Sequence, residues 1–429
     1  MFEIRIDTLS HDGRGVGRRE GKAVFVTGAL AGETVRAQQT GRSRHHDEAR
    51  TLEVVEASPD RVEPRCPHFG TCGGCVLQHL DQARQIEAKQ HALLDTLQRI
   101  GQVAAERTLP TLTDLAWGYR RKGRFSVRYV EKKGKALVGF RETDPRYVAD
   151  LSVCHTVVPE VGRRIPDIAA LVGSLDGRHT LPLIEFIAGD DAVALVFRHL
   201  EPLSDGDLAR LVEFAKSSGL AVFLQPGGVD TVHALWPAHV PLAYSIPGHD
   251  LTLAFHPLDF IQVNAGINGR MIDSALELLD VQPGDRVLDL FCGVGNFTLP
   301  LARRAGQVVG VDVDAGLAGR ARDNAARNGL GNVQFHACDL FTDLRGEPWL
   351  RAGFDKLLLD PPRAGAADVL AQLPLEGIGR IVYVSCHPAS LARDAGFLVH
   401  ERGYTLKAVG ALDMFPQTAH VEGIALFEK

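Results

Sequence analysis

The C-terminal third of the chain alternates short apolar runs with amphipathic segments, and this alternation constrains the fold most. Strand and helix signals that follow one another at such short spacing are typical of a doubly wound, mostly parallel sheet. We therefore expect an α/β fold with a Rossmann-like, parallel-rich domain over residues 261–429. Its expected strands are residues 286–290, 308–312, 333–335, 356–359 and 381–384, with helices at 296–304 and up to about residue 328.

A glycine turn follows the first of these strands, within the stretch Asp289-Leu-Phe-Cys-Gly-Val-Gly-Asn296. Asp312 ends the next strand, about 20 residues on, where an acid can accept both hydroxyls of a ribose. A dinucleotide fold would continue the turn as G-x-G-x-x-G, and this chain does not. The pattern favours S-adenosylmethionine, which has a ribose but no phosphate. Asp339, after the next strand, is placed either to meet the adenine amino group or to cap a helix.

A further acid, Asp360, ends a fourth strand and opens the tetrad Asp-Pro-Pro-Arg. Proline cannot continue a strand ladder, so the tetrad is expected to form a rigid loop over the ligand cleft. It is similar to the Asp/Asn-Pro-Pro-aromatic loop of amino-methyltransferases. Arg363 stands where those enzymes have the aromatic residue that stacks on the target amine, which argues against methylation of an amine.

Cys386 follows the strand at 381–384, beside the same cleft, where a thiolate can attack a bound substrate. A cysteine here can also be a small core residue, but Pro388 fixes the loop that follows it. Glu422 adds a carboxylate that can act as a general base, with His420 as the second candidate. The other interpretation of Glu422 is a solvated surface carboxylate.

Two further regions are expected ahead of the C-terminal domain. Residues 1–56 hold short alternating strands separated by closely spaced glycines, which favours a small OB-like β-barrel. Residues 57–260 are expected to form a central α+β domain. It contains a helix from about residue 80 to 100, where leucine and isoleucine recur at helical spacing, and then alternating strands and helices.

Four cysteines lie outside the C-terminal domain, at Cys66, Cys72, Cys75 and Cys154. By number they suit zinc or an iron–sulfur cluster equally. Zinc sites usually show two similar C-x2-C pairs and here there is one, so the spacing leans towards [4Fe–4S]. A radical enzyme would use three cysteines and leave one iron open, which a fourth cysteine argues against.

Composition limits the location and the partners. The sequence starts without an apolar leader and has no run of roughly 20 apolar residues, so we expect a cytoplasmic protein without disulfides or a membrane span. The net charge of −6 gives no general sign of nucleic-acid binding. Residues 117–146, however, contain ten lysines and arginines against three acids, interleaved with aromatic residues. Such a stretch predicts an RNA-binding face, the alternative being a solvated strand face, and the basic residues of the barrel offer a second contact.

Together these residues resemble the family of RNA uracil-C5 methyltransferases over essentially the whole chain. The matching stretches are Phe260-Ile261-Gln262-Val263-Asn264, Asp289 to Phe297, Asp360-Pro361, Ser385-Cys386-x-Pro388 and His420-x-Glu422. The resemblance implies S-adenosylmethionine as the cofactor, in contact with Gln262, Phe291, Asn296, Asp312, Asp339 and Asp360. A barrel of the TRAM type together with a four-cysteine [4Fe–4S] site is typical of the ribosomal branch, which implies 23S rRNA as the partner. No feature indicates an obligate protein partner, and we expect a monomer.

The resemblance also implies a mechanism. Addition of the Cys386 thiolate to C6 of the uracil makes an enolate, whose C5 then attacks the methyl group of the sulfonium. Glu422 removes the C5 proton before the cysteine leaves, and Asp360 orients the uracil edge. The family usually has alanine where Pro362 stands and asparagine where His387 stands, and neither change removes a group that the mechanism uses.

Three other functions stay open from the sequence. The tRNA branch of the family shares the chemistry but lacks the barrel and the four cysteines. An RNA cytosine-C5 methyltransferase uses the same adduct but usually has a Pro-Cys pair after the motif aspartate, and Pro361-Pro362-Arg363 has no cysteine. A non-catalytic RNA-binding protein would keep the basic face but would need neither Cys386 nor Glu422.

Overall fold

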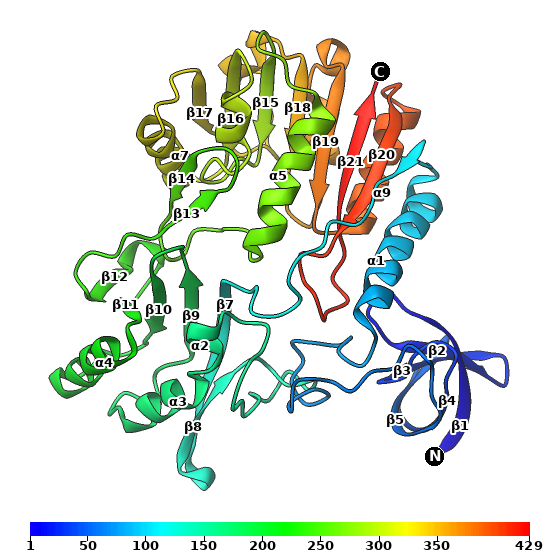
Figure 1. Ribbon diagram of the computed structural model, residues 1–429, viewed down its shortest axis with the longest axis vertical. Coiled ribbons are helices and arrows are strands. Elements are labelled where there is room, and N and C mark those ends of the chain that lie inside the picture. Colours follow the sequence, from blue (N-terminus) through cyan, green and yellow to red (C-terminus); the bar gives the residue numbers. More distant parts are fainter.

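The computed structural model describes residues 1–429, and its first five strands form a closed barrel in the order β1-β2-β3-β5-β4. Alternating apolar residues such as Ile4, Ile6, Val24 and Val26 fill its interior. The barrel lies at the lower right of Figure 1, beside the N-terminus, and confirms the predicted N-terminal barrel. Its strands are β1 Phe2–Leu9, β2 Gly15–Arg19, β3 Lys22–Thr27, β4 Thr34–Arg42 and β5 His46–Glu56.

Helix α1 (Gln82–Thr96) follows a segment, residues 57–81, that contains no helix and no regular strand. Asp81 caps the helix by accepting a hydrogen bond from the Ala83 amide. After a π-helical turn at Leu97–Gly101, the short strand β6 (Arg107–Thr108) joins the edge of the C-terminal sheet. Both α1 and β6 therefore belong to the C-terminal layer in space, although they precede the central sheet in sequence (Figure 1).

The central region is a six-stranded sheet in the order β12-β11-β10-β9-β7-β8. Helices α3 and α4 cover one face and share a core with it. The other face joins the same core as the hairpin β13–β14 and the C-terminal sheet. The elements are β7 Lys122–Val130, β8 Lys135–Gly139, α2 Pro159–Gly162, α3 Ile165–Ser174, β9 Leu183–Ala188, β10 Val193–Arg198, α4 Asp205–Ser218, β11 Ala221–Gln225, β12 His233–Trp236, β13 Ala243–Ile246 and β14 Leu251–Ala254.

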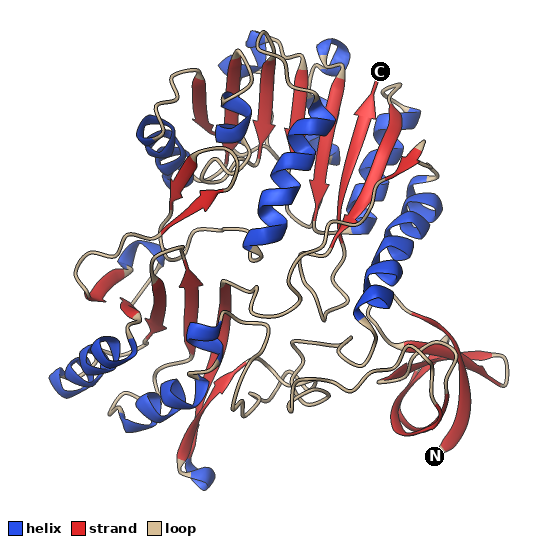
Figure 2. Ribbon diagram, viewed as in Figure 1, coloured by secondary structure: helices blue, strands red, loops and turns tan.

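The C-terminal sheet has eight strands in the order β17-β16-β15-β18-β19-β21-β20-β6. The strands from β17 to β19 are parallel, and β21 runs antiparallel between β19 and β20. The predicted doubly wound, parallel-rich sheet is confirmed, as Figure 2 shows. Its elements are α5 Ala265–Leu279, β15 Arg286–Leu290, α6 Thr298–Ala302, β16 Gln307–Asp312, α7 Ala315–Arg327, β17 Val333–Ala337, β18 Lys356–Leu359, α8 Ala367–Gln372, β19 Arg380–Ser385, α9 Pro388–His400, β20 Thr405–Leu412 and β21 Glu422–Glu428.

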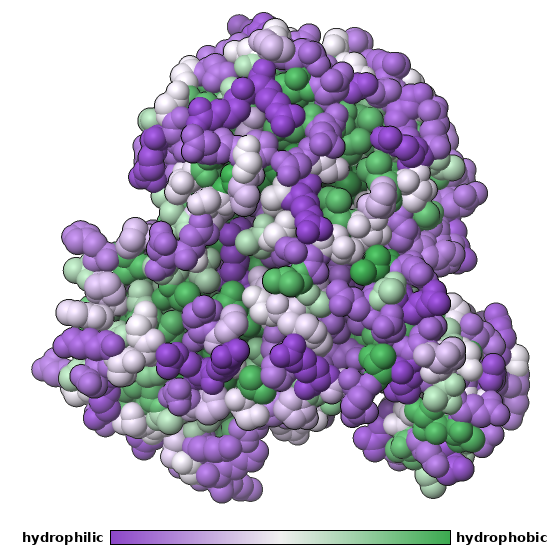
Figure 3. All heavy atoms as spheres, in the orientation of Figure 1, coloured by the Kyte–Doolittle hydropathy of each residue, from purple (hydrophilic) through white to green (hydrophobic).

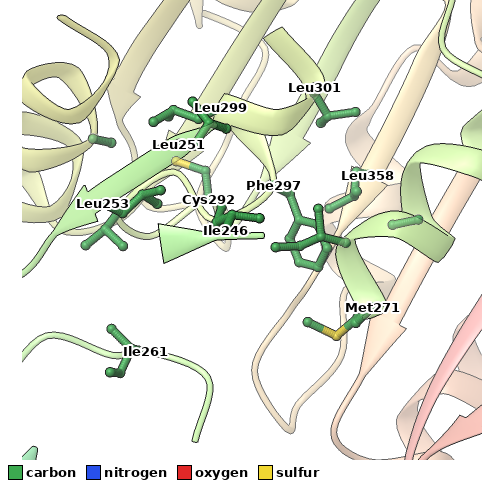
Figure 4. Packing of buried hydrophobic residues seen from close by; sticks show 14 of the residues in the cluster. Ile246, Leu251, Leu253, Ile261, Met271, Cys292, Phe297, Leu299, Leu301 and Leu358 are labelled. Carbon is green, nitrogen blue, oxygen red and sulfur yellow. The ribbon is translucent and has the colours of Figure 1, made fainter. Parts of the chain in front are cut away.

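Successive residues of each strand point to opposite faces, so the sheet separates two cores. Val287 and Leu358 lie in the core on the α5 side, and Leu288 and Leu357 lie in the core on the α9 side. Figure 4 shows the α5-side core at the first strand–helix turn, where Cys292, Phe297, Leu299 and Met271 meet residues of the β13–β14 hairpin. This packing fixes the turn on which the predicted cofactor site depends.

Hydrophilic residues cover most of the face drawn in Figure 3. None of the helices is both long enough and apolar enough to cross a membrane.

Candidate active site

The turn after β15 requires unusual backbone conformations. Phe291 has a φ of +65°, a strained value for a residue with a side chain, and its amide donates to the Val311 carbonyl over 2.8 Å. Gly293 and Gly295 have φ values of +54° and +94°. A Cβ on Gly295 would stand 2.4 Å from the Leu299 side chain, whereas a Cβ on Gly293 would meet nothing within 4 Å. Gly293 thus faces open space, where a ligand can approach the backbone.

The acids at this edge of the sheet have different environments. Asp312 accepts hydrogen bonds from the amides of Gly293 (2.9 Å) and Asp314 (3.0 Å). Asp289 is fully buried and accepts from the Thr298 hydroxyl over 2.5 Å, and burial raises its pKa to about 8. Asp339 accepts from the Phe341 amide over 3.0 Å in a turn, and no helix begins there. The helix-cap interpretation of Asp339 is therefore wrong.

Asn296 is tied into a buried amide network that the sequence did not reveal. Its side chain exchanges hydrogen bonds with that of Asn268, over 2.9 and 2.8 Å, and accepts one from the Tyr244 hydroxyl over 2.9 Å. Asn268 stands one helical turn after Asn264, which caps α5. The i, i+4 spacing of Asn264 and Asn268 is the sequence feature from which this network could have been predicted.

Gln262 and Asp360 meet across the carboxyl edge of the sheet. The Gln262 side-chain amide donates to Asp360 over 3.1 Å, and burial raises the pKa of Asp360 to about 7. The backbone carbonyl of Gln262 accepts from the guanidinium of Arg121 over 2.7 Å. Gln262, which is predicted to contact the cofactor, is therefore held between Asp360 and the central sheet.

Strand pairing brings Cys386 and Glu422 together. Ser385 in β19 is the partner of Gly423 in β21, so the two functional residues leave adjacent strands at the same edge. Glu422 is only 6 % exposed, and burial together with Asp360 raises its pKa to about 8. Burial and then Glu422 and Asp360 raise the pKa of the Cys386 thiol. The interpretation of Glu422 as a solvated carboxylate is wrong.

The residues that flank this pair explain one departure from the family. His387 caps α9 by accepting a hydrogen bond from the Ser390 amide at Nδ1, over 3.3 Å. Asparagine is a strong capping residue, so the family's usual residue can fill the same position. His420 packs on the ring of Phe415, and burial lowers its pKa.

The basic stretch at 117–146 divides into an inner and an outer part. Arg121 is buried, and burial lowers the pKa of Lys122 to about 8. Lys122 donates to the carbonyls of Pro257 and Asp259, so these cations hold the chain that leads to Gln262 and are not part of the surface. On strand β7, Arg124 and Arg128 are exposed, but Arg124 is paired with the buried carboxylate of Glu185 over 3.0 Å. Arg128 stays available for a partner, as do lysines in and beside the β7–β8 turn.

The four cysteines line one pocket, although Cys154 is far from the other three in sequence. None forms a disulfide. The Gly74 amide donates to the Cys72 sulfur over 3.4 Å, and burial raises the pKa of Cys72 to about 11 and of Cys75 to about 12. Nowhere in the chain do three histidine, cysteine or acidic side chains converge closely enough to share one metal ion.

The sheet order, the glycine turn and the acids along its carboxyl edge define a Rossmann-fold methyltransferase. The solved structure of the Pyrococcus abyssi tRNA (uracil-54, C5)-methyltransferase, in complex with S-adenosyl-L-homocysteine, has the same overall fold. Its TM-score is 0.77 at 24% identity, covering 99% of this chain and all of that one.

Sequence comparisons narrow the class. The tRNA (Uracil-5-)-methyltransferase family profile matches residues 239–429, and the TRAM domain profile matches residues 1–39. The 23S rRNA (uracil(1939)-C(5))-methyltransferase RlmD of Xanthomonas campestris is 65% identical over all of this chain and 97% of its own length. The protein of the same name from Stenotrophomonas maltophilia is 62% identical over the same shares. The chain belongs to the RNA uracil-C5 methyltransferase family.

Proposed function

We propose that this protein transfers the methyl group of S-adenosylmethionine to C5 of uridine 1939 in 23S rRNA. The target is the one named for relatives that are 65% identical over the whole chain. The observation that carries the chemistry is the pairing of β19 with β21, which sets the Cys386 thiol beside the buried carboxyl of Glu422.

The cofactor would lie over Gly293, along the carboxyl edge of the sheet. Asp312 has lone pairs left beyond its two amide hydrogen bonds, so it can accept the ribose hydroxyls. Asp339 would meet the adenine amino group. Gln262, Phe291 and Asn296 would complete the contacts, Phe291 through a ring that already packs against Phe341 at 5.9 Å between centroids.

Each step then has a group in place. The Cys386 thiolate adds to C6, and the electron pair of the C5–C6 double bond moves into the enolate. C5 attacks the methyl carbon, whose bond to sulfur breaks, leaving S-adenosylhomocysteine. Glu422 takes the proton from C5, the double bond forms again, and the thiolate of Cys386 leaves. Asp360, between Gln262 and the nucleophile, orients the uracil edge.

The burial of the Glu422 carboxyl supports this division of roles. A base that accepts a proton from carbon works best with a pKa near the working pH, and Glu422 has one of about 8. In the free protein, burial and then the acids Glu422 and Asp360 raise the pKa of the Cys386 thiol. Ionisation of Cys386 would therefore follow the binding of substrate and of the positively charged cofactor, which offsets the two carboxylates.

We further propose that Cys66, Cys72, Cys75 and Cys154 hold a [4Fe–4S] cluster. The four thiols share one pocket with apolar walls, and an amide already points at one sulfur. In such a cluster each thiolate would bind a different iron, and four thiols are the number that a [4Fe–4S] cluster requires. Bound in this way, the cluster would tie residues 66–75 to the loop at 154.

The division of labour along the chain is also a proposal. Residues 1–56 and 57–260 would bind RNA and carry the cluster, and residues 261–429 would perform the reaction. The exposed cations on β7 and β8 support RNA contact by the central part.

Two variants test the chemistry on a transcript of the 23S rRNA segment around uridine 1939. Cys386→Ala is expected to transfer no tritiated methyl group. Glu422→Gln is expected to methylate once and then to remain covalently attached to the RNA, because the C5 proton stays in place. Nucleoside mass spectrometry should find 5-methyluridine from the wild type. Methyl transfer by Cys386→Ala, or modification of tRNA in preference to this transcript, would contradict the proposal.

A further inference from the structure

Helix α1 buries polar side chains where an ordinary surface helix buries apolar ones. Its buried residues are Gln85, Lys89 and Leu93, spaced four apart and therefore on one stripe. A lysine or glutamine is rarely buried without specific partners. Helix α1 lies beside β20 (Figure 1), and its polar stripe contacts the chain that leads from β20 to β21.

Every residue of this stripe holds the segment that ends in Glu422. The Lys89 ammonium donates to the Asp413 carboxylate over 2.6 Å and to the Phe415 carbonyl over 2.9 Å, and both charged side chains are 2 % exposed. Gln85 exchanges two hydrogen bonds of 3.1 Å with Gln417, which has a φ of +70°.

Leu93 packs against the backbone of Gly423. A Cβ added to Gly423 would stand 3.0 Å from the Leu93 side chain. Glu422 precedes this glycine and pairs with Leu412, the neighbour of Asp413. The buried ion pair of Lys89 and Asp413 is therefore one residue beyond the strand partner of Glu422, and the Lys89 charge acts on the Glu422 carboxyl.

The charges around Glu422 come from four elements. Asp360 and Arg363 follow β18, Cys386 follows β19, Asp413 follows β20, and Lys89 is on α1, with His420 in the same loop as Glu422. Burial and then Asp360 disfavour the carboxylate form of Glu422, whereas Lys89 and Arg363 favour it. Of these two cations, Lys89 is the fully buried one.

We propose that Lys89 is a positioning residue for removal of the C5 proton: it fixes the segment before Glu422 and supplies the buried positive charge that the carboxylate needs. This inference rests on the proposed role of Glu422 as the base. It assigns part of the reaction to a residue outside the segment 239–429 that the methyltransferase profile covers.

The charge can be removed without stranding its partner. Lys89→Met alone would leave Asp413 buried and unpaired, which is strongly destabilising, so Lys89→Met is combined with Asp413→Asn. The matched control is Lys356→Met with Asp285→Asn, which removes another largely buried pair (2.7 Å) at the opposite end of β18. The measurement is the fraction of protein covalently attached to the 23S rRNA transcript during turnover, from pH 6 to pH 9.

The attached fraction should fall as pH rises, with a midpoint that reports ionisation of the base. In the Lys89/Asp413 variant the midpoint should move up by at most about one pH unit, because the variant removes a cation that favours the carboxylate of Glu422, and the simultaneous loss of the Asp413 charge offsets part of that effect. The control should keep the wild-type midpoint. Asp413→Asn alone breaks the same ion pair but keeps the cation, so it should give no upward shift. If the double variant does not fold, Lys89→Gln with Asp413→Asn keeps a donor for the Phe415 carbonyl and should give the same shift.

The outcomes separate the two proposals. If Glu422→Gln releases methylated RNA at the wild-type rate, Glu422 is not the base and the proposed function fails at that step. If Glu422→Gln stays attached but the Lys89/Asp413 variant keeps the wild-type midpoint, the inference about Lys89 is overturned. An equal upward shift in Asp413→Asn alone would also overturn it, since the loop and not the charge would then be responsible.

Discussion

The Cys386 site and the four-cysteine pocket are two sites at which burial raises the pKa of thiols, and they are built in opposite ways. Cys386 leaves a buried strand, and hydrogen bonds of 3.1 Å between Ser385 and His387 close the loop around it. Its charged neighbours are the carboxyls of Glu422 and Asp360 and the guanidinium of Arg363. The other site draws three of its cysteines from residues 57–81, which contain no helix or regular strand.

The difference concerns what holds each site in shape. Strand pairing and a helix cap fix Cys386 before any ligand arrives. The four-cysteine pocket depends on turns whose thiols disfavour one another's ionised forms, as Cys154, Cys66 and Cys72 do. An irregular segment of this length in a compact protein usually serves a function, and the function proposed for this one is to hold a cluster.

The largest expected effect is on stability. Cys154→Ser should remove iron and sulfide from the anaerobically purified protein and lower its free energy of unfolding by about 3–4 kcal/mol, as expected for a group bound 100- to 1,000-fold above its Kd. Cys386→Ser should change that free energy by less than about 1 kcal/mol. Urea unfolding and metal analysis measure both. Equal stability of the two variants would contradict the idea that only the four-cysteine pocket depends on a bound group for its shape. Zinc in place of iron would contradict the proposed cluster.

The second prediction concerns the open space beside Gly293. Gly293→Ala puts a methyl group where the cofactor is proposed to lie, so S-adenosylhomocysteine should bind at least about tenfold more weakly by calorimetry, a loss of about 1.4 kcal/mol. The control is Gly329→Ala, since Gly329 also has a positive φ (+68°) and nothing within 4 Å of an added Cβ. The Gly329→Ala variant should bind S-adenosylhomocysteine with the wild-type affinity. Unchanged affinity in Gly293→Ala would place the cofactor elsewhere.

The third prediction uses the carboxyls beside Cys386. Asp360, with a pKa of about 7, is ionised at pH 9 and raises the pKa of the thiol. Asp360→Asn should therefore lower that pKa and speed alkylation of Cys386 by iodoacetamide at pH 9, by about threefold to tenfold. Asp339→Asn, which removes an acid that does not influence Cys386, should react at the wild-type rate. Slower alkylation in Asp360→Asn would mean that the acid activates the thiol.

The smallest effect is expected on the exposed face of β7. Arg128→Ala should weaken binding of the rRNA transcript by about threefold and reduce the slope of log K against log salt by about one. Arg304 is an exposed arginine just before β16, at the edge of the C-terminal sheet opposite to the carboxyl edge. Arg304→Ala should change neither the affinity for the transcript nor the salt slope. Filter binding at several salt concentrations compares the two, and equal behaviour would exclude β7 from the interface.

Much of the catalytic half could be predicted because its information is local. The ends of β15, β16, β18 and β19 follow from apolar runs and the residues that stop them, and Asp312, Asp360 and Cys386 stand at those ends. Residues that reach the site from far away in the sequence could not be predicted from such local patterns. Lys89 meets Asp413 across 324 positions, and nothing near Lys89 in the sequence marks its helix face as polar and buried.

Charge counting overstates the basic surface for a related reason. The stretch 117–146 has ten cations, but Arg121 and Lys122 point inward. A count of charges does not say on which side of the chain they lie. Conversely, the pocket that gathers Cys154 with Cys66, Cys72 and Cys75 was anticipated from residue type, since thiols have few other uses in such a pattern.

The crossing between the central and C-terminal sheets has a mechanical consequence. The chain passes twice between them, and the two passes are bonded to each other where Arg120 bridges Asn264 and Arg121 grips the carbonyl of Gln262. The two sheets also share one hydrophobic core, so they are joined by packing as well as by the two passes. A displacement of the central sheet would therefore move the peptide of Gln262, and with it one side of the proposed cofactor site.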